Sequence, residues 1–189
     1  MSVVGQVAAT RLGLFTYQDL QNTPEDGKRY EVLEGALVVS PSPSWRHQRI
    51  VTRVFAMLLK AEDAGHGKVV PGPMDVVMAE HEVTEPDLLF IVTRRIGIAT
   101  KTHVAGAPDL VVEILSEATR KRDVITKRRI YERYAVPFYW IVDPEEETVR
   151  IFDLREGKYP EPATLRAGQE LSCPLFPGVA VDVGSLFTD

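Results

Sequence analysis

The sequence predicts an α/β fold of the mixed α+β kind, in which a central mixed β-sheet is flanked by helices and extended by added hairpins. Three observations lead to this class. Several short apolar runs have the length of buried strands, and two longer segments repeat apolar residues at helical spacing. Strand and helix patterns also alternate between residues 109 and 142, which favours a right-handed crossover and at least one parallel strand pair.

The first predicted elements are a hairpin and a long helix. Residues 30–33 and 36–39 flank Glu34-Gly35, where the glycine can supply a tight turn. Ser44 can cap a helix that ends near Gly65. The apolar residues of this helix recur every 3.6 positions: Ile50, Val51, Val54, Phe55, Leu58 and Leu59.

The middle of the chain supplies the predicted strands of the sheet. Residues 69–70 and 75–78 form extended segments, and a turn at 79–82 leads into a strand over 86–92. Another strand covers 109–115. All of these runs are short, as is typical of strands in a mixed sheet.

A second helix begins at Thr119 or Asp123 and continues to about Tyr134. The strand 137–142 follows, and residues 148–154 are expected to form a hairpin with it.

A single domain over residues 1–189 is expected, because the chain has no internal repeat, long linker or low-complexity tract. Residues 40–44 are rich in proline and serine, but they are too few to separate domains and predict a loop. Residues 156–189 predict a C-terminal series of short extended pieces broken by proline and glycine.

The composition predicts a cytoplasmic protein without a membrane segment. The longest apolar runs fit one buried strand, and the N-terminus lacks the apolar core of a signal peptide. Cys173 is the single cysteine, so an internal disulfide or a cysteine metal cluster is excluded.

The charge is uneven along the chain. The net charge of −5 argues against general, tight binding of nucleic acid. Residues 120–133 nevertheless hold seven basic side chains against two acidic ones. Such a segment is either an anion site or a solvated helix face, and charge alone favours the solvated face.

Glu113 is the most informative residue, because it interrupts the apolar run 110–115. A near-continuous apolar run predicts a strand covered on both faces, where an unpaired carboxylate costs several kcal/mol. Glu113 should therefore meet a cation, a metal ion or hydrogen-bond donors, or be protonated. A buried glutamate that merely bonds an arginine or a backbone donor is an equally good interpretation.

Asp87 stands at the start of another apolar strand, where a turn hydrogen bond is its common role. If Asp87 and Glu113 lie on adjacent strands, the two carboxylates repel unless a divalent cation lies between them. Oxygen ligands in a half-open site suit Mg²⁺ or Mn²⁺. Asp109 lies about 13 Å along the strand from Glu113, so it is interpreted first as a residue that begins the strand.

Lys127 shares one helix face with Ile130, Tyr131 and Tyr134, which should pack inward. A lysine on a buried face needs a partner. This partner is either Asp123, four residues earlier on the helix, or the carboxylates of the candidate site.

Glu31 and His47 are weaker candidates. Glu31 alternates with its apolar neighbours and points into the site or lies exposed on an edge hairpin. His47 lies on the apolar face of the first long helix, where a satisfied structural histidine is the default and a substrate or metal role is the alternative. No P-loop, Rossmann fingerprint, nucleophile elbow or zinc spacing is present in the sequence.

Pro86-Asp87 followed by a strand that bears Glu113 resembles the PD-(D/E)XK nuclease superfamily. An ordered set of further motifs covers about residues 13–155. These motifs are Tyr30-Glu31-Val32-Leu33-Glu34-Gly35, Ser42-Pro43-Ser44 with His47, Pro108-Asp109-Leu110-Val111-Val112-Glu113-Ile114-Leu115-Ser116, Arg122-Asp123 with Lys127 and Tyr131, and Tyr139-Trp140-Ile141-Val142-Asp143-Pro144. Together they resemble the Uma-two family of predicted restriction endonucleases.

This resemblance implies a restriction-endonuclease-like core and phosphodiester hydrolysis assisted by Mg²⁺ or Mn²⁺, with Asp87 and Glu113 as metal ligands. The superfamily's lysine usually stands two residues after the acidic residue, but this chain has Leu115 there. Lys127 would take its place, orienting or helping to deprotonate water, and Glu31 would bind a second metal ion or its water.

The implied substrate is nucleic acid, with DNA favoured, and its flanking phosphates would meet a set of basic or polar side chains. These are His47, Arg120, Arg122 and Arg128. A homo-oligomer, most simply a dimer, is expected, because cutting a duplex needs two strand scissions. The alternatives are a catalytically silent module that binds nucleic acid or protein on the same fold, and a hydrolase of a smaller phosphoester.

Overall fold

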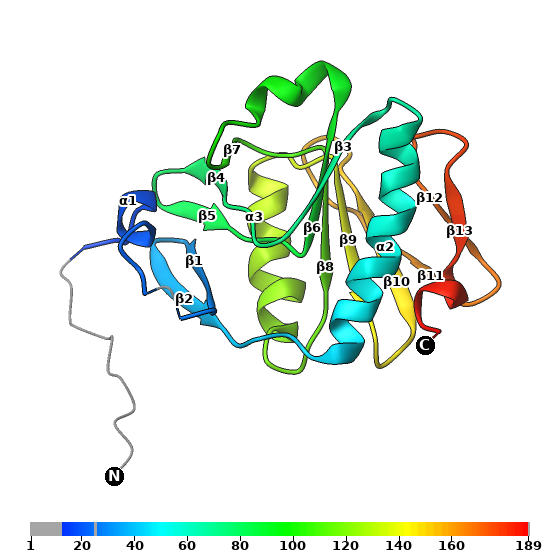
Figure 1. Ribbon diagram of the computed structural model, residues 1–189, viewed down its shortest axis with the longest axis horizontal. Coiled ribbons are helices and arrows are strands. Elements are labelled where there is room, and N and C mark those ends of the chain that lie inside the picture. The colour runs from blue at the N-terminus through cyan, green and yellow to red at the C-terminus, as the bar shows by residue number, and fades with distance from the viewer. Residues whose placement is uncertain (1–12, 25, 189) are drawn as a thin grey trace, which may run out of the picture.

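A six-stranded mixed sheet forms the centre of the computed structural model, which describes residues 13–24 and 26–188 (Figure 1). The strand order is β11-β10-β9-β8-β6-β3. In chain order these strands are β3 (Gly67–Pro71), β6 (Leu88–Val92), β8 (Leu110–Ile114), β9 (Phe138–Asp143), β10 (Thr148–Asp153) and β11 (Ala163–Leu165). Strands β8 and β9 pair in parallel, which confirms the predicted parallel pair, and the other neighbours are antiparallel.

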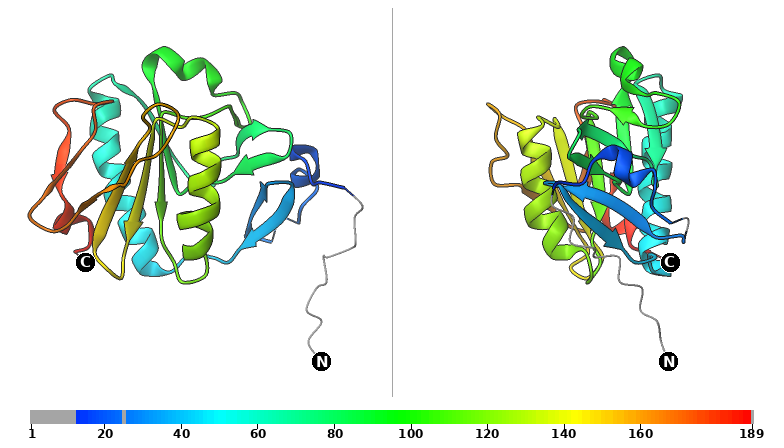
Figure 2. Two further views of the ribbon diagram at one scale, coloured as in Figure 1. Left: turned by 180° about the vertical axis from the view of Figure 1, so that it is seen from behind. Right: turned by 90° about the vertical axis from the view of Figure 1, so that its left-hand side faces the viewer.

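Helices cover the two faces of this sheet, as the right-hand view of Figure 2 shows. One is α2 (Trp45–Asp63), which begins where Ser44 accepts a hydrogen bond from the His47 N–H. The other is α3 (Arg128–Arg133), which continues directly from a π-helical turn, η2 (Arg122–Lys127). Both helices lie within the predicted ranges.

The apolar face of α2 differs at one position from the predicted stripe. Ile50, Val54 and Leu58 are buried as expected, but Leu59 is 38% exposed. Met57 is buried instead, because it lies three residues after Val54 and therefore on the same helix face.

A second, five-stranded sheet has the order β2-β1-β5-β4-β7. Its strands in chain order are β1 (Arg29–Leu33), β2 (Ala36–Ser40), β4 (Val76–Ala79), β5 (Glu82–Thr84) and β7 (Val104–Ala105). The predicted hairpin is confirmed as β1–β2, with Glu34 and Gly35 at φ +52° and +78°. A Cβ atom at Gly35 would also lie 2.6 Å from Leu14, so glycine is required there for two reasons.

Strand β5 was not predicted, because a turn was expected over residues 79–82. The three residues of β5 pair with β4, Val83 pairs with β1 as well, and all three are buried. Glu82 is tolerated inside the sheet because its carboxylate bonds the Glu34 N–H and the Arg133 guanidinium. Pairing from distant segments therefore overrides the polar local sequence. Three other short elements were not predicted: α1 (Tyr17–Leu20), η1 (Thr93–Ile98) and β7.

The C-terminal residues include the expected short extended pieces, β12 (Glu170–Ser172) and β13 (Ala180–Asp182). The 3-10 turn η3 (Val183–Leu186) was not predicted. Leu171, Phe176 and Val183 are buried in the same apolar cluster as α2 and the large sheet. Among the described residues, no helix has the length and hydropathy needed to cross a bilayer.

The register of β6 against β8 brings the two candidate carboxylates together. Leu88 pairs with Val112 in this antiparallel pair, so Asp87 and Glu113 follow as opposite neighbours at the end of the two strands. Glu113 shares the face of Val111, whose apolar cluster includes Tyr131 of α3.

Candidate active site

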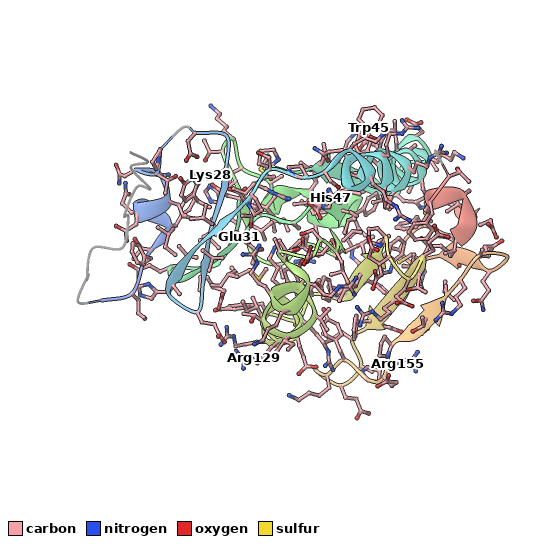
Figure 3. The ribbon with its side chains drawn as sticks, turned by 90° about the horizontal axis from the view of Figure 1, so that it is seen from below. Lys28, Glu31, Trp45, His47, Arg129 and Arg155 are labelled. Atoms are coloured by element: carbon pink, nitrogen blue, oxygen red, sulfur yellow. The ribbon has the colours of Figure 1, made fainter. Side chains whose placement is uncertain are left out.

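A cavity of about 540 Å³ lies between the β1–β2 hairpin, the first turn of α2 and the turn η2. Figure 3 labels Glu31 and His47, two of the residues that line it. Of the eight residues that the sequence predicted for the site, six line it: Glu31, His47, Asp87, Glu113, Arg122 and Lys127. Arg120 and Arg128 do not line it.

Lys127 is the centre of the charged wall of this cavity. Its Nζ lies 2.7 Å from Oε1 of Glu31 and 2.8 Å from Oε1 of Glu113, and 3.8 Å from Oδ1 of Asp123. All four side chains are buried. Both partners considered for Lys127 are therefore present, but the carboxylates from the two sheets make the short contacts.

The charge of Lys127 is fixed by these neighbours. Burial disfavours the ammonium, but Glu113, Glu31 and Asp123 outweigh this cost and raise the pKa of Lys127 well above its ordinary value. Lys127 is consequently a cation at neutral pH. It can donate hydrogen bonds and stabilise negative charge, whereas the expected help in deprotonating water does not suit a lysine held in this form.

Glu113 has the opposite environment. Its Oε1 accepts hydrogen bonds from Lys127 at 2.8 Å and from the Tyr131 hydroxyl at 2.9 Å. Burial and the nearby carboxylates of Asp123, Asp87 and Glu31 raise the pKa of Glu113 to about 8, although Lys127 acts against this shift. The site thus holds more carboxylate than its single ammonium can neutralise.

Asp87 is held as a fully ionised carboxylate. Its Oδ1 lies 2.7 Å from Arg29, and its Oδ2 accepts from the Ile114 N–H at 2.8 Å and lies 3.1 Å from His47 Nε2. Burial alone would raise the pKa of Asp87, but His47, Arg29 and the Ile114 N–H lower it to about 2.

His47 and Arg122 each present a nitrogen without a hydrogen-bond partner among the described residues. These atoms are Nδ1 of His47 and Nε of Arg122, and both are buried. Arg122 also donates to Ser40 Oγ at 2.6 Å. Two donor-bearing side chains are therefore anchored at the cavity wall with one nitrogen each still to be satisfied.

The guanidinium groups of Arg120 and Arg128 contact residues outside the cavity. Arg120 donates two hydrogen bonds to Asp143, at 2.6 and 2.8 Å. The Arg128 guanidinium lies over the Phe152 ring, 5.2 Å from its centroid, and donates to the Tyr159 carbonyl. The structure does not bring these two residues to the cavity.

The basic segment 120–133 is likewise not a free cationic surface. Arg129 pairs with Glu34, Arg133 pairs with Glu82, and Lys127 is buried at the site. Most of its cations are therefore neutralised by acidic residues of other elements, which is close to the solvated-face interpretation.

Two further sequence interpretations concern the strand that carries Glu113. Asp109 accepts the Val92 N–H at 3.0 Å and pairs with Arg95 at 2.8 Å, so it fixes the start of the strand and stands outside the cavity. Leu115, at the position of the superfamily's lysine, is buried in an apolar cluster.

Sequence reasoning missed four charged residues of the cavity wall. Arg29, Glu85 and Glu117 were not considered, and Asp123 was considered only as a helical partner of Lys127. Alternation could have identified Arg29, since it lies two residues from Glu31 on β1 and shares its strand face, whereas Glu85 lies between β5 and β6. Glu85 also donates its backbone N–H to Glu31 at 2.8 Å.

The donor set of the cavity suits a hard divalent cation. No group of three or more histidine, cysteine or acidic side chains within residues 13–24 and 26–188 is arranged as a ready metal site. The cavity wall nevertheless carries the excess of buried carboxylates described above, and burial and repulsion from Asp75 and Glu31 raise the pKa of Glu85 to about 8 as well. Oxygen donors in a carboxylate-rich pocket fit Mg²⁺ or Mn²⁺, which would relieve this repulsion.

Comparison with known proteins shows a related fold and a family. A crystal structure titled as a putative nuclease belonging to DUF820, from Anabaena variabilis ATCC 29413, has the same fold, with a TM-score of 0.77. It shares 19% sequence identity, and the alignment covers 92% of this chain and 97% of that chain. No curated protein matches the chain.

A family model named Uma2, with the description "Putative restriction endonuclease", matches residues 16–184. This match confirms the resemblance seen in the sequence and extends it past residue 155 into the C-terminal segment. It also supports a nuclease role. The chain belongs to the Uma2 family.

Proposed function

We propose that this protein hydrolyses phosphodiester bonds of nucleic acid, with DNA as the favoured substrate and Mg²⁺ or Mn²⁺ as the cofactor. The observation that carries the proposal is the Lys127 ammonium, held 2.7 and 2.8 Å from the carboxylates of Glu31 and Glu113 in a cavity that Asp87 also lines. Two opposed carboxylates beside a permanent cation form a site that suits phosphoryl chemistry.

Asp87 and Glu113 are the residues that would hold the divalent ion. When bound, such an ion supplies Lewis-acid stabilisation of the negative charge that grows on the phosphoryl oxygens. Asp87 is ionised at every pH of interest because its pKa is about 2. Glu113 lies opposite Asp87 in the strand register, so one ligand comes from each of two adjacent strands.

Lys127 is assigned two tasks. Its ammonium has three donor hydrogens, and the contacts to Glu31 and Glu113 account for two of them. The third is available to orient the attacking water or to contact a phosphoryl oxygen. Glu31 fixes the ammonium and accepts the Glu85 N–H, so it acts as a positioning residue.

His47 and Arg122 are assigned to the substrate phosphate. Each has a buried nitrogen that lacks a hydrogen-bond partner among the described residues, with Nε of Arg122 lying 3.9 Å from Oε2 of Glu31, and both side chains line the cavity. Arg122 is the stronger candidate, because a guanidinium is always charged and suits phosphate geometry. Arg120 and Arg128 are left out of the proposed machinery, since their guanidinium groups are engaged away from the cavity.

The proposal is tested by incubating purified protein with supercoiled plasmid, single-stranded DNA and RNA in Mg²⁺, Mn²⁺ or EDTA. We expect cutting that needs the metal and is lost in Lys127→Met. Lys121→Met, which alters an exposed lysine just before η2, is the matched control and should cut normally.

Three results would overturn the proposal. Equal cutting by wild type and Lys127→Met would indicate a contaminating nuclease. Hydrolysis of bis(p-nitrophenyl) phosphate without cutting of any nucleic acid would indicate a phosphoesterase of small substrates. Absence of both activities, with nucleic acid still bound, would favour the catalytically silent module.

A further inference from the structure

Trp45 is a large apolar side chain that the fold leaves unused. It is the first residue of α2 and is 78% exposed, more than any other large apolar residue in the described part of the chain. Figure 3 shows its ring projecting from the outer side of α2, whereas His47 lies on the inner side. An indole in this position contributes little to the core, so its function must be sought at the surface.

A second cavity lies beside the candidate active site. Its volume is about 340 Å³, and it shares four wall residues with the first cavity: Arg29, Pro43, Glu85 and Asp87. Gln48, one helical turn after Trp45, and Pro43, two residues before it, also line this cavity. Trp45 itself lines neither cavity, but it stands between these two residues in the chain, at the first turn of α2.

Charges of both signs line the second cavity. Lys28 and Arg29 stand there with Glu85 and Asp87, and Arg29 is paired with Asp87. Lys28 is half exposed and pairs with Asp26, an exposed ion pair of the kind that a phosphate can replace at small cost. A replaceable lysine in the cavity wall and an exposed indole beside Pro43 together offer a cation and an aromatic ring, which is the combination that single-stranded nucleic acid uses.

We propose that the second cavity guides the nucleic-acid strand away from the cleaved bond, and that Trp45 stacks on an unpaired base of that strand. This inference rests on the proposed function. The chemistry required is a nucleobase face, which DNA and RNA both supply. A protein partner is disfavoured, because polar and charged residues flank the single indole, among them Arg46, Gln48 and Arg49, so no contiguous apolar patch is formed.

Fluorescence gives a direct measurement, because the chain has only two tryptophans and Trp140 is fully buried. Single-stranded DNA and RNA 12-mers are titrated into the full chain with Ca²⁺ in place of Mg²⁺. We expect quenching and reduced accessibility to acrylamide on binding, and neither change in Trp45→Phe, which keeps a stacking ring but removes the reporter. Quenching that survives in Trp45→Phe, or binding that leaves Trp45 unquenched, contradicts the proposal.

Kinetics separate stacking from a structural effect. We expect Trp45→Ala to raise KM for single-stranded oligonucleotides by about tenfold with kcat unchanged, and Trp45→Phe to restore most of the affinity. Leu59→Ala, at an exposed apolar position on the same helix, is the matched control and should change neither constant.

An abasic scan completes the test. Removing one base from the oligonucleotide at the stacked position should raise the KM of wild type by about tenfold, as Trp45→Ala does. The same removal should have no further effect on the KM of Trp45→Ala. If wild type cuts but no abasic position shows this coupling, the stacking proposal is wrong and the nuclease proposal stands. If wild type neither cuts nor binds any nucleic acid, the proposed function itself fails, and this inference fails with it.

Discussion

Lys127 Nζ lies 2.8 Å from Glu113 Oε1, and this contact joins the helical segment that follows β8 to the middle of the buried sheet. The lysine reaches the strand because η2 is a π-helical turn that buries both Asp123 and Lys127. π-Helical turns are rare and frequently mark functional sites. Leu115 occupies the strand position where the superfamily usually has its lysine. Lys127 supplies this cation from the helical segment instead.

Replacing Glu113 by glutamine should weaken binding of Mn²⁺ by about tenfold or more, because a neutral amide is a poor ligand for a hard divalent ion. Cleavage should fall with it. Isothermal titration with Mn²⁺ measures the first effect, and Glu170→Gln, at an exposed position on β12, is the control. Unchanged Mn²⁺ affinity in Glu113→Gln would remove this residue from the metal site.

Replacing Asp123 by asparagine should lower the cleavage rate by no more than about threefold, because the 3.8 Å contact is the weakest of the three that hold Lys127. Glu31 and Glu113 keep the ammonium in place. Steady-state rates on one oligonucleotide decide the question. A loss as deep as that of Lys127→Met would show that the helical partner, rather than the two strand carboxylates, positions the lysine.

The Arg120–Asp143 pair is expected to serve stability rather than substrate binding. Asp143 accepts two hydrogen bonds from Arg120 and also bonds the Glu145 and Glu146 N–H groups. Asp143→Asn should lower the free energy of unfolding at pH 7 by about 1 kcal/mol, a figure reduced for the exposure of Arg120. Urea unfolding measures this loss, and Asp153→Asn, which alters a more exposed pair, should have almost no effect.

The same pair predicts a pH dependence of stability. Burial opposes ionisation of Asp143, but Arg120 and the two N–H groups outweigh it and lower its pKa below the ordinary value. Its contribution is therefore present above the pKa of the unfolded chain, about 3.9, and is lost as the pH falls through the lower folded value. The difference in stability between wild type and Asp143→Asn should shrink between pH 4 and pH 3. A difference that does not shrink as the pH falls below 4 would contradict this account.

A dimer is predicted because both strands of a duplex must be cut. The described part of the chain offers one candidate active-site cavity, and cutting both strands needs two. We expect a dimer by light scattering at micromolar concentration. The basic segment 120–133 adds little to this expectation, since it is largely paired within the chain.

The sequence predicted the large sheet and the two helices well, because their apolar periods are long enough to be unambiguous. The buried position of Glu113 followed from the apolar run around it, and Lys127 from its helix face. The small sheet was harder to predict: β5 has three residues, and its burial depends on pairing with segments far away in the chain. Arg120 and Arg128 were misplaced because charge shows where cations are in the chain but not which carboxylate or ring they contact.

The measurement that tests the central claim most directly compares Lys127→Met with wild type for Mn²⁺ binding and DNA cleavage in the same preparation. Removing the ammonium leaves Glu31 and Glu113 without their shared cation, so Mn²⁺ should still bind and should raise the melting temperature of the variant. Turnover should fall by about two to three orders of magnitude, because the charge that stabilises the phosphoryl transition state is gone. Lys127→Met that binds Mn²⁺ and cuts DNA at the rate of wild type would contradict the account.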